Sequence, residues 1–298
     1  MREPELFEIR FPDGRLQKGA CLLTPSATKN LLCIVGMNGW HRRWLSFAEA
    51  LNENGINFYA VDPMGQGLNA KPNQEMVVEK GAFKQNVEAL KIKLDELQKE
   101  LSTSILGHSA GSFAVELLLE TYPSSAEKVI ICGTDYPKIK YLFGYGLLSL
   151  ITNEKNGSKP DYFLDKMAAK KMNKHIENPL TKYDWTTRDQ ESIKARLEDS
   201  HANNVTPKCF FKELLWGIKT VRHGLKKISP DENILLIYGS ADPFGGYGKG
   251  PKKLEKKYKK LGLQNVSSIE YEDYRHELLN ELNNERVFAD IIEFIKSN

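Results

Sequence analysis

Residues 102–114 read Ser-Thr-Ser-Ile-Leu-Gly-His-Ser-Ala-Gly-Ser-Phe-Ala. A short apolar run, a serine flanked by glycines and a helix-forming segment predict a strand, a sharp turn and a helix. Gly107, Ser109 and Gly111 match the G-x-S-x-G pattern of a nucleophile elbow, where glycines leave room for a serine in a strained turn. Ser109 is therefore the candidate nucleophile, and the alternative is an ordinary glycine-rich connection between a strand and a helix.

The composition is that of a globular protein. Of the 298 residues, 41% are hydrophobic and 27% are charged, and a chain of this length commonly forms one large α/β unit with an insertion. The formal net charge of +3 is too small to favour a nucleic-acid partner. Acidic residues near the start and the lack of any run of ~20 apolar residues predict a soluble cytoplasmic protein. The four cysteines have no metal-ligand spacing and are expected to be reduced packing residues.

Strand and helix signals alternate along most of the chain. Pro12-Asp13-Gly14 lies between two apolar stretches and predicts an opening antiparallel hairpin. The later apolar runs alternate with amphipathic segments, which is typical of a mostly parallel sheet with helices on both faces. We therefore expect an eight-stranded α/β sheet that binds its ligand at the carboxyl ends of its strands. The predicted strands are 6–11, 19–24, 31–35, 57–61, the run before the elbow, 128–132, 234–238 and 266–271.

The alternation stops between residue 134 and about residue 230. This stretch has no clear strand, has several short helical segments and is too long for a connecting loop. We interpret it as a helical lid over the strand ends, which divides the chain into a first core part (1–135), a lid (136–230) and a second core part (231–298). The lid's apolar residues are expected to lie either in its own core or on a surface that faces the substrate. They are Tyr141, Leu142, Phe143, Tyr145, Leu147, Leu148, Phe163, Trp185, Phe210, Phe211, Leu214, Leu215 and Trp216.

A serine hydroxyl needs a base to remove its proton, and the base needs a carboxylate that holds its tautomer. In an elbow of this kind the acid and then the histidine follow the serine along the chain. Asp242 follows the predicted strand 234–238 and His276 follows the predicted strand 266–271, so both are placed for these roles. The competing acids are Glu270, Glu272 and Asp273, which precede His276 closely. His108, inside the elbow, is expected to be a packing residue.

Several segments together resemble the monoacylglycerol lipase and lysophospholipase branch of the α/β-hydrolases, a serine aminopeptidase S33-type group. The resemblance covers nearly the whole chain and implies an α/β-hydrolase fold with a helical lid. It also implies that Ser109 attacks an ester carbonyl, that His276 is the general base and that Asp242 orients His276, with no metal or organic cofactor. The segments are Phe47 to Leu51, Gly107 to Gly111, Tyr183-Asp184-Trp185 with Arg188-Asp189, Gly239 to Gly250, and Arg275 to Glu281.

The resemblance also implies an oxyanion hole made by two backbone N–H groups, those of Ala110 and Met37. Here the chain departs from the family, which usually has His-Gly where this chain has Val35-Gly36 and usually has an arginine where Met64 stands. Because the donors are backbone groups, Val35 does not remove them.

The leading functional hypothesis is a carboxylic ester hydrolase for a lipid-like substrate with one acyl chain, because a helical lid over the site suits an apolar ligand. The alternatives are a serine aminopeptidase or amidase, a thioesterase or acyltransferase, and a non-catalytic binding protein of the same fold. Seven lysines between residues 249 and 260 predict a solvated helix face, with weak membrane-surface contact as the alternative. The expected partner is thus a small ester or lipid and not a nucleic acid, and the oligomeric state is left open.

Overall fold

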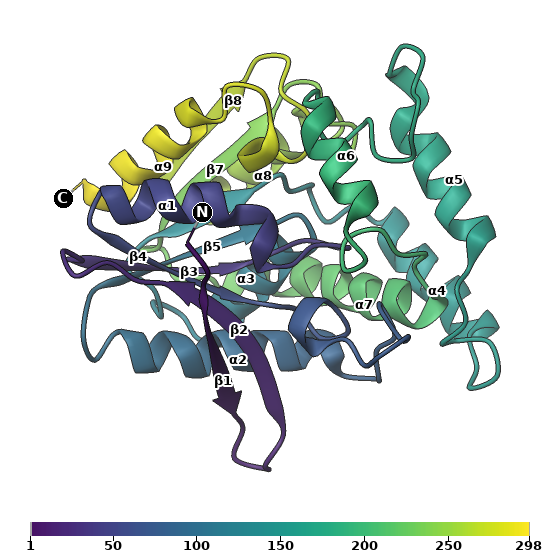
Figure 1. The fold of residues 1–298 in the computed structure, drawn as a ribbon, viewed down its shortest axis with the longest axis horizontal. Coiled ribbons are helices and arrows are strands. Elements are labelled where there is room, and N and C mark those ends of the chain that lie inside the picture. The colour runs from purple at the N-terminus through teal and green to yellow at the C-terminus, as the bar shows by residue number, and fades with distance from the viewer. Residues whose placement is uncertain (1, 298) are drawn as a thin grey trace.

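The computed structural model describes residues 2–297, so the outer ends of the expected ranges 1–135 and 231–298 lie outside the description. Figure 1 shows a central sheet with helices on both sides. The sheet has eight strands in the order β1-β2-β4-β3-β5-β6-β7-β8, and all pairs from β4 to β8 across it are parallel. The strands are β1 (Glu5–Arg10), β2 (Leu16–Leu22), β3 (Lys29–Ile34), β4 (Ile56–Val61), β5 (Thr103–His108), β6 (Val129–Cys132), β7 (Asn233–Gly239) and β8 (Asn265–Tyr271).

The predicted hairpin forms, but its second strand starts earlier than its apolar residues indicate. β2 begins at Leu16 because the turn after Arg10 is short and Leu16 pairs directly with Arg10 across the antiparallel ladder. Polar residues at the start of β2 lie on this twisted edge ribbon, where an apolar pattern is not required. The central strands β3, β5 and β6 are almost entirely buried, as their continuous apolar runs predict.

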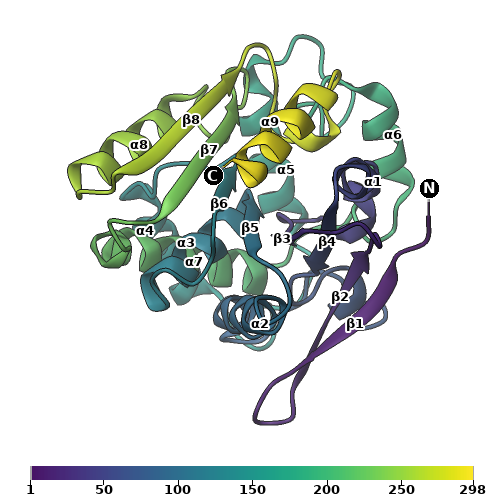
Figure 2. The same ribbon diagram turned by 90° about the vertical axis from the view of Figure 1, so that its left-hand side faces the viewer.

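Helices lie on both faces of the sheet (Figure 2), and an apolar cluster lies on each face. Helices α1 (Leu45–Glu53) and α9 (Glu285–Lys296) pack on one face, and both carry the predicted 3.6-residue spacing of apolar side chains. Helices α2 (Ala82–Leu97), α3 (Ala110–Thr121) and α8 (Lys249–Lys260) pack on the other face. This arrangement leaves the carboxyl ends of the parallel strands open to the segment inserted between β6 and β7.

The inserted segment is helical, as its sequence predicts. It contains α4 (Lys140–Ile151), α5 (Tyr162–Met172), α6 (Gln190–Glu198) and α7 (Lys208–Gly224), which lie on the right in Figure 1. Helix α7 is anchored to the core, because Ile218 and Val221 are buried in the same apolar cluster as α2 and α3. At Gly217 the ring of Phe83 comes so close that an added Cβ would lie 2.4 Å from it.

One prediction about the lid is wrong. Phe143, Leu147 and Phe163 lie neither in a lid core nor toward a substrate, since their exposed fractions are 72%, 60% and 71%. The reason is that α4 is apolar on nearly all sides, so that one side packs on α7 while another is left in solvent. We call the exposed set the lid apolar face. It consists of Ile139, Phe143, Leu147, Leu150 and Ile151 on and before α4, and Tyr162, Phe163 and Met167 on α5.

Candidate active site

The turn between β5 and α3 holds Ser109 in a backbone conformation that side chains rarely adopt. Its φ is 54° and its ψ is −118°, and its N–H donates to the carbonyl of Cys132 on β6 at 3.0 Å. Cβ atoms at Gly107 and Gly111 would lie 2.5 Å from the Gly111 carbonyl oxygen and 2.4 Å from the Ile34 carbonyl oxygen, respectively. The two glycines are therefore needed for close backbone approach, and the strained turn raises Ser109 above the strand ends.

The structure brings together the three side chains that the sequence places in order. His276 Nε2 lies 2.8 Å from Ser109 Oγ, and His276 Nδ1 lies 3.0 Å from Asp242 Oδ2. Asp242 is completely buried, and its second oxygen accepts the N–H of Phe244 at 2.8 Å. With Nδ1 protonated toward Asp242, Nε2 is free to accept the serine proton.

The competing acids do not reach His276. Glu270 is paired with Lys252 at 2.7 Å, and Glu272 is exposed. Asp273 has a φ of 62° at the tip of the loop, where its N–H bonds to the hydroxyl of Ser240. Glu270 lies near the end of β8 and Glu272 and Asp273 lie on the loop of His276, and all three are exposed, whereas the buried Asp242 arrives from the neighbouring strand end.

Aromatic side chains enclose the His276 ring. The rings of Trp185 from the lid and Phe244 after β7 have their centroids 4.7 Å and 5.1 Å from it, and His108 lies 4.8 Å away. Burial, with a smaller contribution from the nearby His276, lowers the pKa of His108 to about 4. His108 is therefore neutral, and its Nε2–H donates to the backbone carbonyl of His276 at 3.1 Å. This contact makes His108 a packing residue that supports the histidine loop, as its sequence position suggests.

The backbone N–H groups of Met37 and Ala110 have no acceptor within residues 2–297. Both residues line the same cavity as Ser109. The first N–H groups of a helix have no intrahelical acceptor, which explains the free donor at Ala110, the first residue of α3. The pair can therefore receive an oxygen that develops negative charge.

The loop after β3 is fixed by contacts that the sequence does not signal. Asn38 has a φ of 57°, and its N–H donates to the side chain of Gln66. Its side-chain amide makes two hydrogen bonds with the backbone of Asn204 in the lid, and its carbonyl accepts from Arg196 on α6. Val35, which replaces the family's histidine, is buried beneath this loop. The geometry of the loop thus depends on lid residues and not only on the core.

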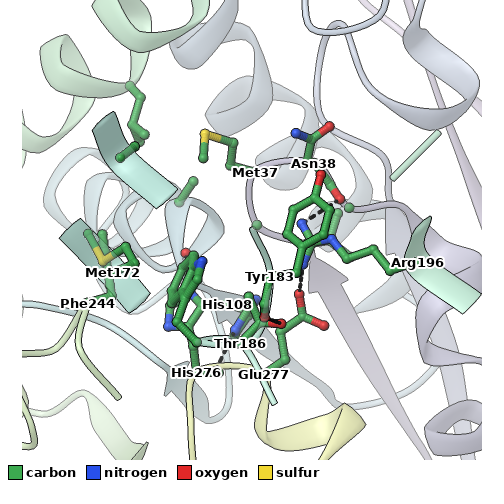
Figure 3. Close-up of a pocket in the computed structure, with 18 of the residues that line it drawn as sticks. Met37, Asn38, His108, Met172, Tyr183, Thr186, Arg196, Phe244, His276 and Glu277 are labelled. Atoms are coloured by element: carbon green, nitrogen blue, oxygen red, sulfur yellow. Dashed lines mark hydrogen bonds and ion pairs between the residues drawn. The ribbon is translucent and has the colours of Figure 1, made fainter. Parts of the chain in front are cut away.

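Ser109 opens into a cavity of about 240 Å³ between the strand ends and the lid. Figure 3 shows its two different ends, with Met172 and Phe244 on one side of His276 and Arg196 with Asn38 on the other. Most of the lining is apolar, including residues of α5 and α7. The expectation that some apolar lid residues face the substrate site is therefore met by five of them. Tyr141, Trp185, Phe211, Leu214 and Leu215 line the cavity.

The polar end of the cavity is organised around Glu277, the residue after His276. Its carboxylate is bonded to Arg43 before α1 and to Arg196 on α6. Burial alone would raise the pKa of Glu277, but the charges of Arg43 and Arg196 outweigh burial and hold this pKa well below its ordinary value. Sequence reasoning missed the three-residue cluster because its members come from three distant segments. The one available signal was Glu277 itself, inside the terminal segment Arg275 to Glu281.

The sequence of this chain matches a known protein family. Residues 25–283 match the sequence profile of the family described as serine aminopeptidase, S33. The chain belongs to this family. The match covers most of the S33 chain, including Ser109, Asp242 and His276, and it confirms the expected α/β-hydrolase relationship.

Several solved structures are similar in fold to this chain over nearly its whole length. A thermostable carboxyl esterase from Bacillus coagulans in complex with glycerol has a TM-score of 0.84 and 22% identity, covering 98% of each chain. An open-form lipase has a TM-score of 0.82 and 20% identity, covering 97% of this chain and 98% of its own. A soluble variant of the Saccharomyces cerevisiae monoglyceride lipase with a substrate analogue has a TM-score of 0.72 and 15% identity, covering 99% and 96%.

These likenesses establish the fold of the S33 chain. It is the α/β-hydrolase fold, with the predicted mostly parallel eight-stranded sheet. No curated protein sequence matches the chain. Within residues 2–297, none of the helices is both long enough and apolar enough to cross a membrane.

Proposed function

We propose that this protein is a serine carboxylic ester hydrolase that acts on a lipid-like substrate with a single acyl chain, a monoacylglycerol or a lysophospholipid. The observation that carries the proposal is the hydrogen-bonded series from Asp242 through His276 to Ser109, which ends in a mainly apolar cavity. A cavity of this kind suits an acyl chain, and the serine at its wall suits an ester carbonyl at the end of that chain.

In this mechanism Ser109 is the nucleophile. His276 takes the hydroxyl proton as Oγ bonds to the ester carbonyl carbon, and the N–H groups of Met37 and Ala110 bind the oxyanion. The carbon–alkoxide bond then breaks, His276 gives its proton to the departing alcohol, and an acyl-serine remains. A water then attacks the acyl carbon while His276 takes one of its protons. The tetrahedral intermediate collapses as the bond to Ser109 Oγ breaks, His276 returns the proton to Oγ, and the carboxylic acid is released. Asp242 holds the His276 tautomer and stabilises its cationic form.

The structural neighbours support the proposal as analogies. One is an esterase that holds glycerol, and another is a monoglyceride lipase that holds a substrate analogue. A similar structure is also a thioesterase domain, with a TM-score of 0.58. Since one fold hosts several acyl-transfer reactions, the choice of an ester substrate depends on the cavity of this chain.

The cavity argues against an aminopeptidase in spite of the family's description. A substrate with a free ammonium group would need an unpaired carboxylate near Ser109. Within residues 2–297, both acidic residues that line the cavity are already paired with cations, Glu277 with two arginines and Asp165 with Lys182 at 3.3 Å. An added ammonium would therefore meet positive charge, which opposes its binding.

We further propose that the lid apolar face contacts anionic lipid surfaces. Eight large apolar side chains are exposed on and before the consecutive helices α4 and α5, and the same stretch of sequence is rich in exposed lysines. Residues 136–180 contain exposed lysines at 140, 155, 159, 166, 170, 171 and 174 but exposed glutamates only at 154 and 177. The lysine-rich helix α8 fits this role less well, because its apolar residues Leu254 and Tyr258 are buried against the core.

A substrate panel tests the proposed reaction. The purified protein is assayed with p-nitrophenyl esters, monoacylglycerols, lysophospholipids, acyl thioesters and aminoacyl anilides, and labelled with a fluorophosphonate. The proposal expects labelling and the highest kcat/KM on an acyl glycerol ester. Preference for an anilide would indicate the aminopeptidase alternative, preference for a thioester would indicate the thioesterase alternative, and an unlabelled protein would indicate a binding function.

A cytoplasmic location is also proposed, supported by four free cysteines.

A further inference from the structure

Arg43 presents unused hydrogen-bond donors to the cavity. One of its terminal nitrogens, Nη2, bonds to Glu277, while Nε and Nη1 have no acceptor within the described residues 2–297. The Arg43 side chain lines the cavity and is only 10% exposed. Neither Nε nor Nη1 is among the fully buried unpaired atoms of the described residues, so a ligand or water can reach these two donors.

The charges around Arg43 do not balance. Arg196 is fully engaged, because it bonds to Glu277 and to the carbonyl oxygens of Asn38 and Ala202. Glu277 is therefore one carboxylate shared by two guanidinium groups. The other ion pair that lines the cavity, Lys182 with Asp165, is neutral as a pair. The polar end of the cavity thus carries one positive charge in excess.

We infer that Arg43 forms a subsite for an anionic group on the alcohol portion of the substrate, a phosphate or a carboxylate. The free Nε–H and Nη1–H groups point from different edges of the guanidinium plane, and either can donate a charge-assisted hydrogen bond to an oxygen of such a group. The inference rests on the proposed ester hydrolysis and names the substrate class more closely. Neutral glycerol esters and anionic glycerol esters are then distinguished by this residue.

The position of the subsite assigns it to the alcohol and not to the acyl chain. Met172 and Phe244 line the opposite side of His276 from Arg196 (Figure 3), and that apolar end suits the acyl chain. Arg43 is bonded to Glu277, the residue that follows His276, so its charge lies on the Arg196 side of the reacting serine. An ester carbonyl at Ser109 would direct its acyl chain to one end and its alcohol to the other.

Three esters with the same acyl chain test the inference: 1-octanoylglycerol, 1-octanoylglycerol 3-phosphate and 3-octanoylglycerate. The wild-type protein should hydrolyse one or both anionic esters with a kcat/KM at least about tenfold above that of the neutral ester. The phosphate and the glycerate separate the two anions. Equal kcat/KM for all three esters would overturn the inference while leaving the proposed reaction intact.

The variant Arg43→Gln should lower the ratio of anionic to neutral kcat/KM by at least about tenfold, mainly through KM. The matched control is Arg42→Gln, since Arg42 is the exposed neighbour that bonds to Glu3 outside the cavity. It removes the same charge and should leave the ratio unchanged. If Arg43 only supports the histidine loop through Glu277, Arg43→Gln will lower all three rates equally, and the subsite is then disproved.

Two measurements on the wild-type protein remain decisive if Arg43→Gln does not fold. Glycerol 3-phosphate or glycerate should inhibit hydrolysis of 1-octanoylglycerol at least about tenfold more strongly than glycerol, and equal inhibition contradicts the subsite. If no octanoyl ester is hydrolysed although a fluorophosphonate labels Ser109, the proposed function fails by itself. The subsite is then judged by whether the anionic esters slow the labelling more than 1-octanoylglycerol does.

Discussion

The side chain of Asn38 and the backbone of Asn204 are joined by two hydrogen bonds across the boundary between core and lid. Asn38 Nδ2 donates to the Asn204 carbonyl at 2.8 Å, and the Asn204 N–H donates to Asn38 Oδ1 at 3.2 Å. Asn38 follows Met37, one of the two proposed oxyanion donors. The lid therefore supports the loop that carries this donor, although the proposed nucleophile, base and acid all lie outside the lid.

Removal of this link should slow the chemical step. Asn38→Gly keeps the backbone free to adopt a positive φ but deletes both side-chain hydrogen bonds, so the Met37 N–H is held less firmly. We expect kcat on a soluble ester to fall about tenfold to a hundredfold, with KM within about twofold, since loss of a whole oxyanion donor costs 10²–10³. Asn204→Ala is the control, because the link uses only the Asn204 backbone. An unchanged kcat in folded Asn38→Gly would show that the link is not needed.

The acid next to His276 can be tested against its neighbours in the loop. Asp242→Asn should lower kcat by a large factor, on the order of 10⁴, because the amide favours the wrong tautomer of His276. Glu272→Gln and Asp273→Asn should each change kcat by less than about tenfold, as expected for exposed charges. All three variants are compared on one activated ester after folding is checked by circular dichroism. A larger loss in either loop variant would assign the role to that residue instead.

Residues near each other in sequence, or spaced in a regular pattern, could be predicted well. The sheet, the elbow and the helical insertion follow from apolar runs, glycines and periodicity. Chain order and strand ends pointed to Asp242 and His276, whose side chains the structure places 3.0 Å apart. The cluster of Arg43, Arg196 and Glu277 could not be predicted in this way. Its members come from segments whose proximity is decided by how the lid folds back on the core, and no local pattern encodes that contact.

The prediction for the exposed lid residues was wrong for a related reason. An apolar side chain predicts burial, but α4 has more apolar surface than α7 can cover, so that Phe143 and Leu147 remain in solvent. The sequence pattern cannot tell how many sides of an apolar helix find a partner. The same excess of apolar surface is what supports the proposed contact with lipid.

Binding to vesicles tests that contact. The protein should co-float with vesicles of phosphatidylcholine and phosphatidylserine, but not with phosphatidylcholine alone, and added salt should weaken binding. Phe143→Glu should reduce binding at least about tenfold, since burial of one large apolar side chain contributes ~1.5–3 kcal/mol. Lys260→Gln on α8 lowers the net charge by the same one unit as Phe143→Glu but lies outside the lid, so it should bind nearly as wild type. A dimer through the lid in light scattering, with no vesicle binding, would contradict the proposal.

Two buried glutamates on α3 predict a loss of stability at alkaline pH. Burial raises the pKa of Glu116 to about 8 and that of Glu120 to about 9, with the neighbouring carboxyl as a further cause for Glu120. Above pH ~4.5 the unfolded chain has released these protons, while the folded chain retains that of Glu116 to about pH 8 and that of Glu120 to about pH 9. The free energy of unfolding should therefore fall as pH rises through this interval and level off above it.

The matching variant is Glu120→Gln, which cannot ionise. Its melting temperature should exceed that of the wild type by a few degrees at pH 9, with a smaller difference at pH 5, and Glu53→Gln on the exposed side of α1 is the control. A difference that is the same at both pH values would show that Glu120 does not titrate in this way.

The most direct test of the proposed function is Ser109→Ala, studied in the purified and folded protein. Ser109 is the residue at the apex of the elbow, whereas the hydroxyl of Ser112 is buried and bonded to the Ser109 carbonyl and to Thr134. Fluorophosphonate labelling and hydrolysis of 1-octanoylglycerol are measured side by side with the wild type. We predict that both are lost together while the melting temperature stays within a few degrees, and retained hydrolysis by Ser109→Ala would contradict the account.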